Sequence, residues 1–280
     1  MSQSAVDGYI RIHLMSLGTP VEIRAAGNRA TVLASAIRAA WDFCLTDAPS
    51  EVAPVETIVV DALLDSRPAV VQAAVQRGAL AHSTLDMIMH ELSPRITLAA
   101  MDRQAASLLM FHACGVADVV TGRVLMLVGP SGAGKTTAAR ALGTAAYGYV
   151  SDETVALRGD DAVVSYPKPL SILLGTDSDL KAQVSPSSCG FLRAPDDLRL
   201  GRIAVLRRDP DAPRVPRVEA VGTLPAMGAL SPHISYLARR RRPLHRLAEV
   251  LHLSGGLVRV HYREATDLVP IVPDLLSAQR

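Results

Sequence analysis

The sequence predicts an α/β protein in which a smaller α+β region, residues 1–105, precedes an α/β core, residues 106–280. Two observations support this division. In the first region, runs that alternate apolar and polar residues, as strands do, are interspersed with segments of helical periodicity. In the second, short apolar runs bounded by turn residues surround a glycine-rich loop and an alanine-rich helix. A chain of 280 residues fits one large domain or two modest ones.

The elements expected in the first region follow from these periodicities. Residues 9–15 and 20–24 alternate and are joined by a turn at Leu17-Gly18-Thr19, which predicts a pair of strands. Apolar residues at helical spacing predict a helix over 28–43, and a short apolar run predicts a strand over 56–63. Two helices, 83–92 and 96–109, are expected with Ser93-Pro94 between them, because proline disfavours a helix interior.

The second region begins with two apolar runs, 107–115 and 123–129, around a turn at Gly122. The alanine-rich helix is expected over 134–145. Strands are expected on both sides of an acidic pair, at 147–151 and 154–158, and again at 162–166, 170–174, 202–207 and 257–262. The proline-rich stretch 209–216 predicts an exposed loop, and 264–276 predicts a closing helix.

Composition excludes several classes of function. The net charge is +2 and the pI about 8.5, which does not favour a nucleic-acid partner. The three cysteines are far apart and form no CxxC pair, so neither a zinc site nor a disulfide framework is indicated. No stretch approaches the ~20 apolar residues that span a bilayer, and the N-terminus does not resemble a signal peptide. We therefore expect a cytoplasmic protein without a membrane partner.

The strongest motif is the segment Gly-Pro-Ser-Gly-Ala-Gly-Lys-Thr at 129–136, which follows an apolar run and precedes the expected helix. It matches the complete P-loop (Walker A) pattern. Its backbone N–H groups and the helix N-terminus form a site for phosphate, while Lys135 reaches the β- and γ-phosphates and the Thr136 hydroxyl ligates Mg²⁺. The sequence thus predicts ATP and Mg²⁺ as cofactors, with the nucleotide held by Gly129, Ser131, Gly132, Ala133, Gly134, Lys135, Thr136 and Thr137.

A second motif is the acidic pair Asp152-Glu153. Asp152 follows Lys135 by 17 positions (152 − 135), the length of one helix and one returning strand. A carboxylate at the end of such a strand can orient a hydroxyl for in-line attack on the γ-phosphate. The alternative is an exposed acidic turn with no role in chemistry.

Residues 111–116, 122–137, 150–157 and 166–171 together resemble the HPr kinase/phosphorylase family and its smaller relatives, which share a histidine on the strand before the P-loop strand. The resemblance implies a P-loop fold akin to phosphoenolpyruvate carboxykinase and phosphoryl transfer to a hydroxyl, usually of serine. It also implies that Asp152 is the general base, that Glu153 supports the metal or the base, and that His112 lies near the phosphates. By itself, His112 is equally compatible with a packed core histidine.

This sequence departs from that family in two ways. Glu153 replaces the second aspartate of the acidic pair, and the Gly-x-Gly-Ile-Ile-Asp signature of true HPr kinases does not follow it. The smaller relatives that also lack this signature are associated with peptide natural products, which implies a precursor peptide as acceptor. Relatives assemble as hexamers, so the resemblance leaves a homo-oligomer open.

We therefore expect an ATP- and Mg²⁺-dependent kinase that phosphorylates a serine or threonine hydroxyl of a peptide or protein, with Asp152, Lys135 and His112 as catalytic residues and Thr136 and Glu153 at the metal. One alternative is a nucleotide-dependent switch or partner-binding module without phosphotransfer. A transporter-type ATPase is disfavoured, because no late apolar strand ending in Asp-Glu is present.

Other signals carry less weight. Leu253-Ser254-Gly255-Gly256 spells the core of a transporter signature but is interpreted as a turn before the last strand. The basic run 239–242 is either a solvated helix end or a contact for phosphate or an acidic peptide. Lys168, between two prolines, is either a phosphate contact or, as is commoner for lysine, a side chain that faces solvent. His233 has no partner at metal-ligand spacing.

Overall fold

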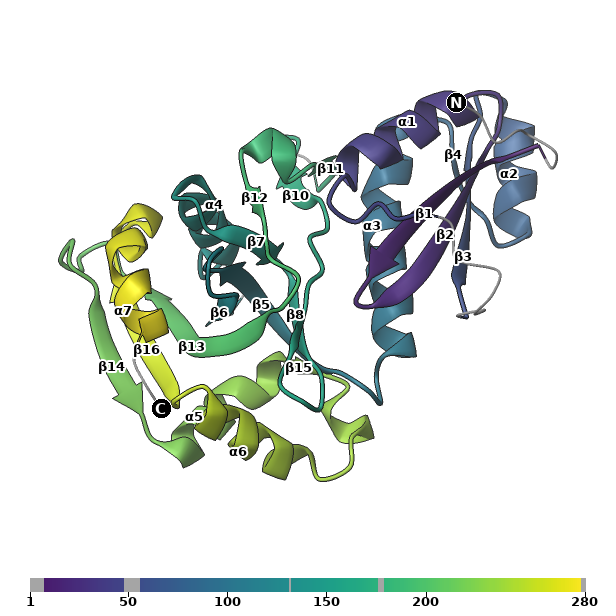
Figure 1. The fold of residues 1–280 in the computed structure, drawn as a ribbon. Coiled ribbons are helices and arrows are strands. Elements are labelled where there is room, and N and C mark those ends of the chain that lie inside the picture. The colour runs from purple at the N-terminus through teal and green to yellow at the C-terminus, as the bar shows by residue number, and fades with distance from the viewer. Residues whose placement is uncertain (1–7, 48–55, 131, 176–178, 278–280) are drawn as a thin grey trace. The chain divides into compact units, whose positions relative to one another are not determined.

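The computed structural model describes residues 8–47, 56–130, 132–175 and 179–277. Within them the chain is a mixed α/β protein with several sheets (Figure 1). It forms two compact units, of which one runs to Arg103 and includes Lys168–Ser188, and the other comprises Gln104–Pro167 and the chain from Cys189 onward. The segment 168–188 thus clusters with the first unit, although it falls within the second of the two domains expected from the sequence. The expected boundary at 105/106 stays a prediction.

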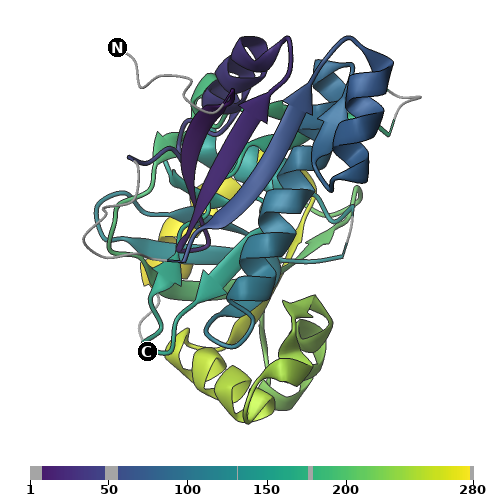
Figure 2. The same cartoon turned by 90° about the vertical axis from the view of Figure 1, so that its right-hand side faces the viewer.

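The first unit is built on a four-stranded sheet in the order β1-β2-β3-β4. Strands β1 and β2 form the expected hairpin, and β2, β3 and β4 are parallel, connected through helices α1 and α2. Alternate residues such as Ile12, Ile23 and Val60 are buried. Helices α1, α2 and α3 pack against this sheet (Figures 1 and 2). The bounds are β1 Ile10–Ser16, β2 Thr19–Ala26, α1 Ala30–Ala40, β3 Ile58–Leu64, α2 Pro68–Gln76, β4 Leu80–His82 and α3 Leu85–Arg103.

One prediction for this unit is wrong. The helices expected at 83–92 and 96–109 are a single helix, α3, with Pro94 inside it. Ser93 is buried on this helix, and its carbonyl accepts a hydrogen bond from Thr97 Oγ1 at 2.9 Å. Proline costs one intrahelical hydrogen bond, and here the buried face of α3, which includes Leu92 and Ile96, continues across it. Tertiary packing therefore overrides the local preference.

The second unit contains a larger sheet whose main path is β12-β7-β5-β6-β13-β16-β14. Strands β6, β13 and β16 run parallel, and β5 is antiparallel to both β6 and β7. The strand bounds are β5 Leu109–Ala117, β6 Arg123–Val128, β7 Gly148–Ser151, β8 Thr154–Leu157, β9 Val163–Val164, β12 Leu192–Arg193, β13 Arg199–Arg208, β14 Arg217–Val221, β15 Ile234–Ser235 and β16 Leu257–Tyr262.

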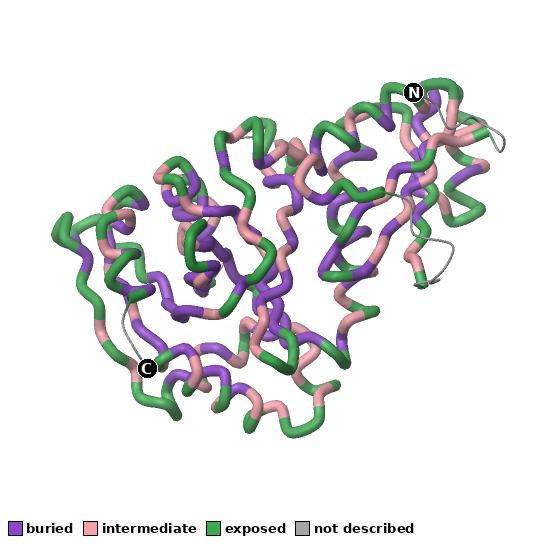
Figure 3. The backbone as a smooth tube through the Cα atoms, viewed as in Figure 1, coloured by how far each residue is buried: buried purple, intermediate pink, exposed green. Residues whose placement is uncertain are grey.

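Helices cover both faces of this sheet (Figure 1). Helix α4 and the closing segment pack on one face, where the core includes Leu127, Leu142 and Val260. Helices α5 and α6 pack on the other, against a core that includes Phe111 and Val128. The strands between them are buried (Figure 3). The helices are α4 Lys135–Thr144, α5 Thr223–Leu230, α6 Pro243–Leu253 and α7 Val272–Ser277, with 3₁₀ turns η2 Ser231–His233, η3 Leu237–Arg239 and η4 Ala265–Ile271.

The closing helix expected at 264–276 is therefore two pieces, η4 and α7. Pro270 lies inside η4, which explains why a regular α-helix does not run through this segment. The loop expected at 209–216 lies between β13 and β14, as expected. The remaining elements, β10 Leu170–Leu173, β11 Lys181–Val184 and η1 Ser187–Cys189, follow one another, and β10 pairs antiparallel with β11. In the described ranges, no helix has both the length and the apolar character needed to cross a membrane.

Candidate functional site

The glycine-rich loop leaves the sheet at Gly129, immediately after β6 ends, and α4 begins at Lys135. Gly132 and Gly134 have positive φ angles, 81° and 85°, in the left-handed region that glycine adopts at low cost. A Cβ on Gly129 would lie 2.8 Å from the Ala133 Cβ, so the two ends of the loop are too close for a larger residue. The backbone thus forms a tight turn onto a helix N-terminus, the geometry that suits a phosphate.

The side chain of Lys135 folds back over this loop. Its Nζ donates hydrogen bonds to the carbonyl oxygens of Gly129 at 2.8 Å and Pro130 at 3.2 Å. The residue is only 8% exposed, and burial lowers the pKa of its amine. Two carbonyl oxygens of the loop therefore hold the lysine side chain against it.

Tyr262, at the end of β16, braces the loop from the neighbouring strand. Its hydroxyl donates a 2.8 Å hydrogen bond to the carbonyl oxygen of Ala133. A Cβ on Gly134 would lie 2.5 Å from the same hydroxyl, so glycine is required there both for φ and for space. Nothing in the local sequence indicated this contact, because it joins the loop to the last strand of the sheet.

The acidic pair lies at the same edge of the sheet as the loop. Strand β5 lies between β6 and β7 and pairs with both. Ala113 is opposite Val128 of β6, and Gly115 is opposite Ser151 of β7. Both β6 and β7 run antiparallel to β5, so their carboxyl ends meet at one edge of the sheet. Gly129 follows one of these ends and Asp152 the other. The register therefore brings Asp152 toward the loop, although β5 lies between the two strands.

Asp152 is buried, which rules out the exposed acidic turn for this residue. Its Oδ1 accepts a 3.0 Å hydrogen bond from the hydroxyl of Tyr149, three positions earlier. The Tyr149 ring is fully buried against Phe191, with ring centroids 4.8 Å apart. The carboxylate is thus oriented by a packed aromatic side chain. Glu153 is half-buried, and its backbone N–H donates to Ser151 Oγ at 3.3 Å.

His112 lies on β5 at this edge. It is exposed, so it is not a packed core histidine. Burial of part of the ring and the charge of Lys135 lower its pKa, while Glu153 and Asp152 raise it. The loop lysine and both acidic residues therefore act on one imidazole.

The structure adds His233 to this group. Burial, Lys135 and His112, in that order, lower the pKa of His233. The sequence does not indicate this residue, because it has no neighbour at metal-ligand spacing; its neighbour comes instead from β5, through the pairing of Ile234 with Phe111. Cys114 is also close, but it is completely buried, and burial raises the pKa of its thiol far above the usual range. It is therefore a packed, protonated side chain rather than a nucleophile.

The remaining residues that the sequence predicts to contact the nucleotide lie in the same loop and the first turn of α4. Ala133 and Thr136 are half-buried and Thr137 is exposed, in the loop and the first turn of α4. The first turn of a helix leaves N–H groups without intrahelical acceptors, which is where a phosphate binds. Ser131 lies outside the described residues, so its predicted role stays a prediction.

The expected metal ligands are two, Thr136 and Glu153. No group of three or more His, Cys, Asp or Glu side chains placed to hold a metal occurs in the part of the chain that the structure describes. Mg²⁺ at nucleotide sites takes one or two protein oxygens and completes its shell with water and phosphate oxygens. A threonine hydroxyl and one carboxylate fit that ligand set, whereas a metal cage made by the protein alone does not fit these residues.

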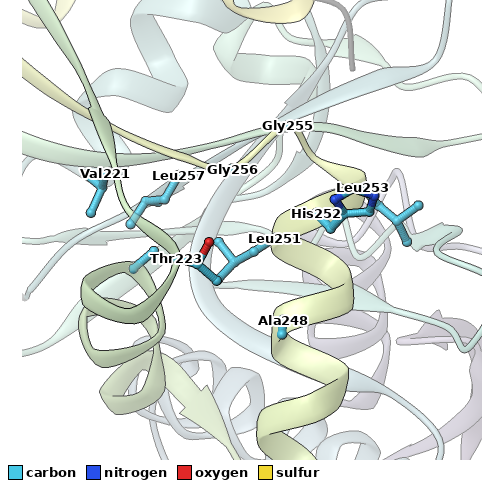
Figure 4. Close-up of a pocket in the computed structure, with 10 residues that line it drawn as sticks. Val221, Thr223, Ala248, Leu251, His252, Leu253, Gly255, Gly256 and Leu257 are labelled. Carbon is cyan, nitrogen blue, oxygen red and sulfur yellow. The ribbon is translucent and has the colours of Figure 1, made fainter.

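A separate cavity of about 510 Å³ lies between α5, α6 and the start of β16 (Figure 4). Thr223, His252 and the turn Gly255-Gly256 line it together with apolar side chains. Leu257 begins β16, whereas Tyr262 ends it, so the cavity lies at the opposite end of this strand from the loop. The glycines of the transporter-like signature are thus a turn before the last strand, as predicted, with φ angles of 68° and 85°.

Two further expectations can be compared with the structure. Arg240, in the basic run, donates to the carbonyl oxygens of Ala106 and Leu108, whereas Arg239, Arg241 and Arg242 are exposed. Arg239 is the last residue of η3 and Arg242 is the N-cap of α6, so the run lies between two helix ends. Lys168 is only 2% exposed, so the expectation that it faces solvent is wrong. The two prolines that flank Lys168 in the sequence do not indicate whether its side chain is buried.

No known family profile matches this chain, and no curated protein matches it. Among solved structures, the chain is similar to the HPr(Ser) kinase/phosphatase from Coxiella burnetii. The likeness covers 59% of this chain and 92% of that chain, with 13% sequence identity and a TM-score of 0.31. This is a distant structural relationship, and at this TM-score it carries no argument about function.

Proposed function

We propose that this protein is an ATP- and Mg²⁺-dependent kinase that transfers the γ-phosphoryl group of ATP to a serine or threonine hydroxyl of a peptide or protein. The observation that carries the proposal is the register of β5, which brings Asp152 and His112 to the edge where the loop of Lys135 leaves the sheet. A phosphate-binding turn, a lysine and an oriented carboxylate are the parts that phosphoryl transfer requires.

Each residue has a distinct part in this proposal. The backbone of the loop and the N-terminus of α4 hold the triphosphate. The Asp152 carboxylate takes the proton of the acceptor hydroxyl, whose oxygen then forms a bond to the γ-phosphorus as the bond to ADP breaks. Lys135 stabilises the charge that develops on the phosphoryl oxygens. Thr136 and Glu153 would hold Mg²⁺, which would supply further charge neutralisation.

The acceptor is best sought among peptides. The signature that follows the acidic pair in true HPr kinases is missing from this sequence, which argues against HPr itself. The resemblance to the smaller relatives makes a natural-product precursor peptide the first acceptor to test. Such a peptide would present a serine or threonine hydroxyl to Asp152.

Phosphotransfer from γ-labelled ATP tests the proposal, with peptides encoded beside this gene as acceptors. The parent protein should transfer label to a peptide, and Asp152→Asn should lose transfer while it retains ATP affinity. Asp196→Asn, which changes an exposed aspartate of the same unit, is the matched control and should transfer label like the parent. Release of label only as free phosphate with every acceptor would contradict the proposal.

A nucleotide-dependent switch is the second candidate, favoured by one observation. The first unit, built on β1–β4, lies outside the P-loop motif and has a buried core of its own, which leaves its surface to hold a partner under this alternative. Under this alternative the Asp152→Asn variant behaves like the parent protein in partner binding, and no acceptor becomes labelled.

A further inference from the structure

We propose that His233 contacts the phosphates in this site, and that its imidazole donates a hydrogen bond to the γ-phosphoryl group of bound ATP. The inference rests on the proposed function and extends it by one residue. His233 precedes β15 in a segment far from the P-loop in sequence. Its position follows from the strand pairing and from its charged neighbours.

The strand pairing places His233 where β6 leaves the sheet. Strand β5 pairs with β8 along one edge over Leu109–His112, so β15, which pairs with Met110 and Phe111, lies along the other edge. Only two residues separate β7 from β8, so these two strands lie along the same side of β5. Strands β6 and β15 therefore both lie along the opposite side of β5. Along β5, β15 therefore occupies the positions that follow the end of β6, where the glycine-rich loop begins.

The register then fixes one position. Val128 is opposite Ala113, and Ile234 is opposite Phe111. The position between them, opposite His112, is the one that Gly129 would occupy if β6 continued. His233 reaches this position from β15, as Gly129 leaves it toward α4. The two histidines are thus cross-strand neighbours beside the first glycine of the loop.

Side-chain alternation along β5 directs the imidazole of His112 toward the loop. Phe111 and Ile234 lie in the core under α5 and α6, whereas Cys114 lies in the core under α4. Successive residues of a strand point to opposite faces, so His112 points to the face that carries α4. This is the face onto which the loop folds. His233 is the last residue of η2, directly before Ile234, and the charges of Lys135 and His112 both act on its imidazole.

The charged neighbours agree with this placement. Lys135 influences both imidazoles, and each histidine is half-buried or exposed rather than packed in the core. The position of His233 is also rigid, because Ile234 is buried and Ser231 Oγ donates a 2.7 Å hydrogen bond to the carbonyl of Met227 in α5. A fixed N–H donor beside Lys135 suits the outermost phosphate, since Lys135 reaches the β- and γ-phosphates.

The test compares two nucleotides that differ in the γ-phosphate. Affinities for a non-hydrolysable ATP analogue and for ADP are measured by calorimetry for the parent, His233→Ala and His233→Gln. A hydrogen bond to a charged oxygen predicts that His233→Ala weakens the ATP analogue about tenfold and leaves ADP unchanged. Gln carries an N–H at a similar distance and should restore part of the loss. His245→Ala, on the exposed face of α6, is the matched control and should change neither affinity.

Three outcomes decide the matter. Selective loss of the ATP analogue with partial rescue by His233→Gln supports the inference. If His233→Ala leaves both affinities unchanged, or weakens both by the same factor, the inference is overturned. If His233→Ala does not fold, the ratio of the two affinities for His233→Gln decides. Lys135→Ala distinguishes a failure of the His233 inference from a failure of the proposed kinase function. A parent protein that binds neither nucleotide contradicts the proposed function itself. So does a parent protein whose nucleotide affinity is unchanged in Lys135→Ala.

Discussion

The contact between Gly134 and Tyr262 gives a prediction whose size follows from the structure. Alanine at Gly134 must adopt a φ near 85°, which costs an L-residue about 1–2 kcal/mol. Its Cβ would also lie 2.5 Å from the Tyr262 hydroxyl, so the ring must move and its hydrogen bond to Ala133 is lost, at about 1 kcal/mol. We expect Gly134→Ala to lower the free energy of unfolding by about 2–3 kcal/mol in total.

Gly132→Ala is the matched control, because Gly132 has a similar φ of 81° but nothing within 4 Å of an added Cβ. Urea unfolding followed by circular dichroism should show that Gly132→Ala costs about 1 kcal/mol less than Gly134→Ala. In a Tyr262→Phe background the hydroxyl is gone, so this difference should largely vanish. Equal costs of the two alanines in the parent, or an unchanged difference in the Tyr262→Phe background, would refute the reasoning.

Three further perturbations follow. Tyr149→Phe removes the hydrogen bond to Asp152 and should cost about 1.5–3 kcal/mol in urea unfolding and slow phosphotransfer; a variant that unfolds and transfers like the parent would contradict this. Arg202→Met leaves three backbone carbonyls without their donor and should lower the free energy of unfolding by about 1–3 kcal/mol. An unchanged urea midpoint would contradict this expectation. The hydrogen bond from Arg67 holds the pKa of Asp65 well below its usual 3.8, so this carboxylate stabilises the fold above pH 3.8 and less as the pH falls further. Asp65→Asn should therefore be less stable than the parent at neutral pH, with a gap that narrows below pH 3.8; a constant gap would show that the ion pair contributes nothing.

The sequence predicts those parts of the site that depend on neighbouring residues. The loop 129–136 is a local motif, and a strand, a turn and a helix around it are read from adjacent apolar runs. The position of Asp152 near the loop was also predictable from the sequence, because only one helix and one returning strand separate it from Lys135. The hairpin of β1 and β2 was predictable for the same reason, since its turn and both its strands are contiguous.

Contacts between distant segments were not predictable. Strand order and register bring Tyr262 to the loop and His233 near His112, and no local pattern specifies either. The continuous α3 shows the opposite error, in which a strong local signal, Pro94, was outweighed by packing along the whole helix. The burial of Lys168 likewise depends on the tertiary structure and not on its two flanking prolines.

The central claim is that the loop around Lys135 binds a nucleoside triphosphate. Equilibrium titration of the parent protein and of Lys135→Ala with ATP and Mg²⁺ tests it most directly. Losing a charged hydrogen-bond donor to phosphate should weaken binding about 10- to 100-fold, while Lys181→Ala, an exposed lysine of the other unit, should bind like the parent. Binding that is absent in the parent, or the same in Lys135→Ala, would contradict the account.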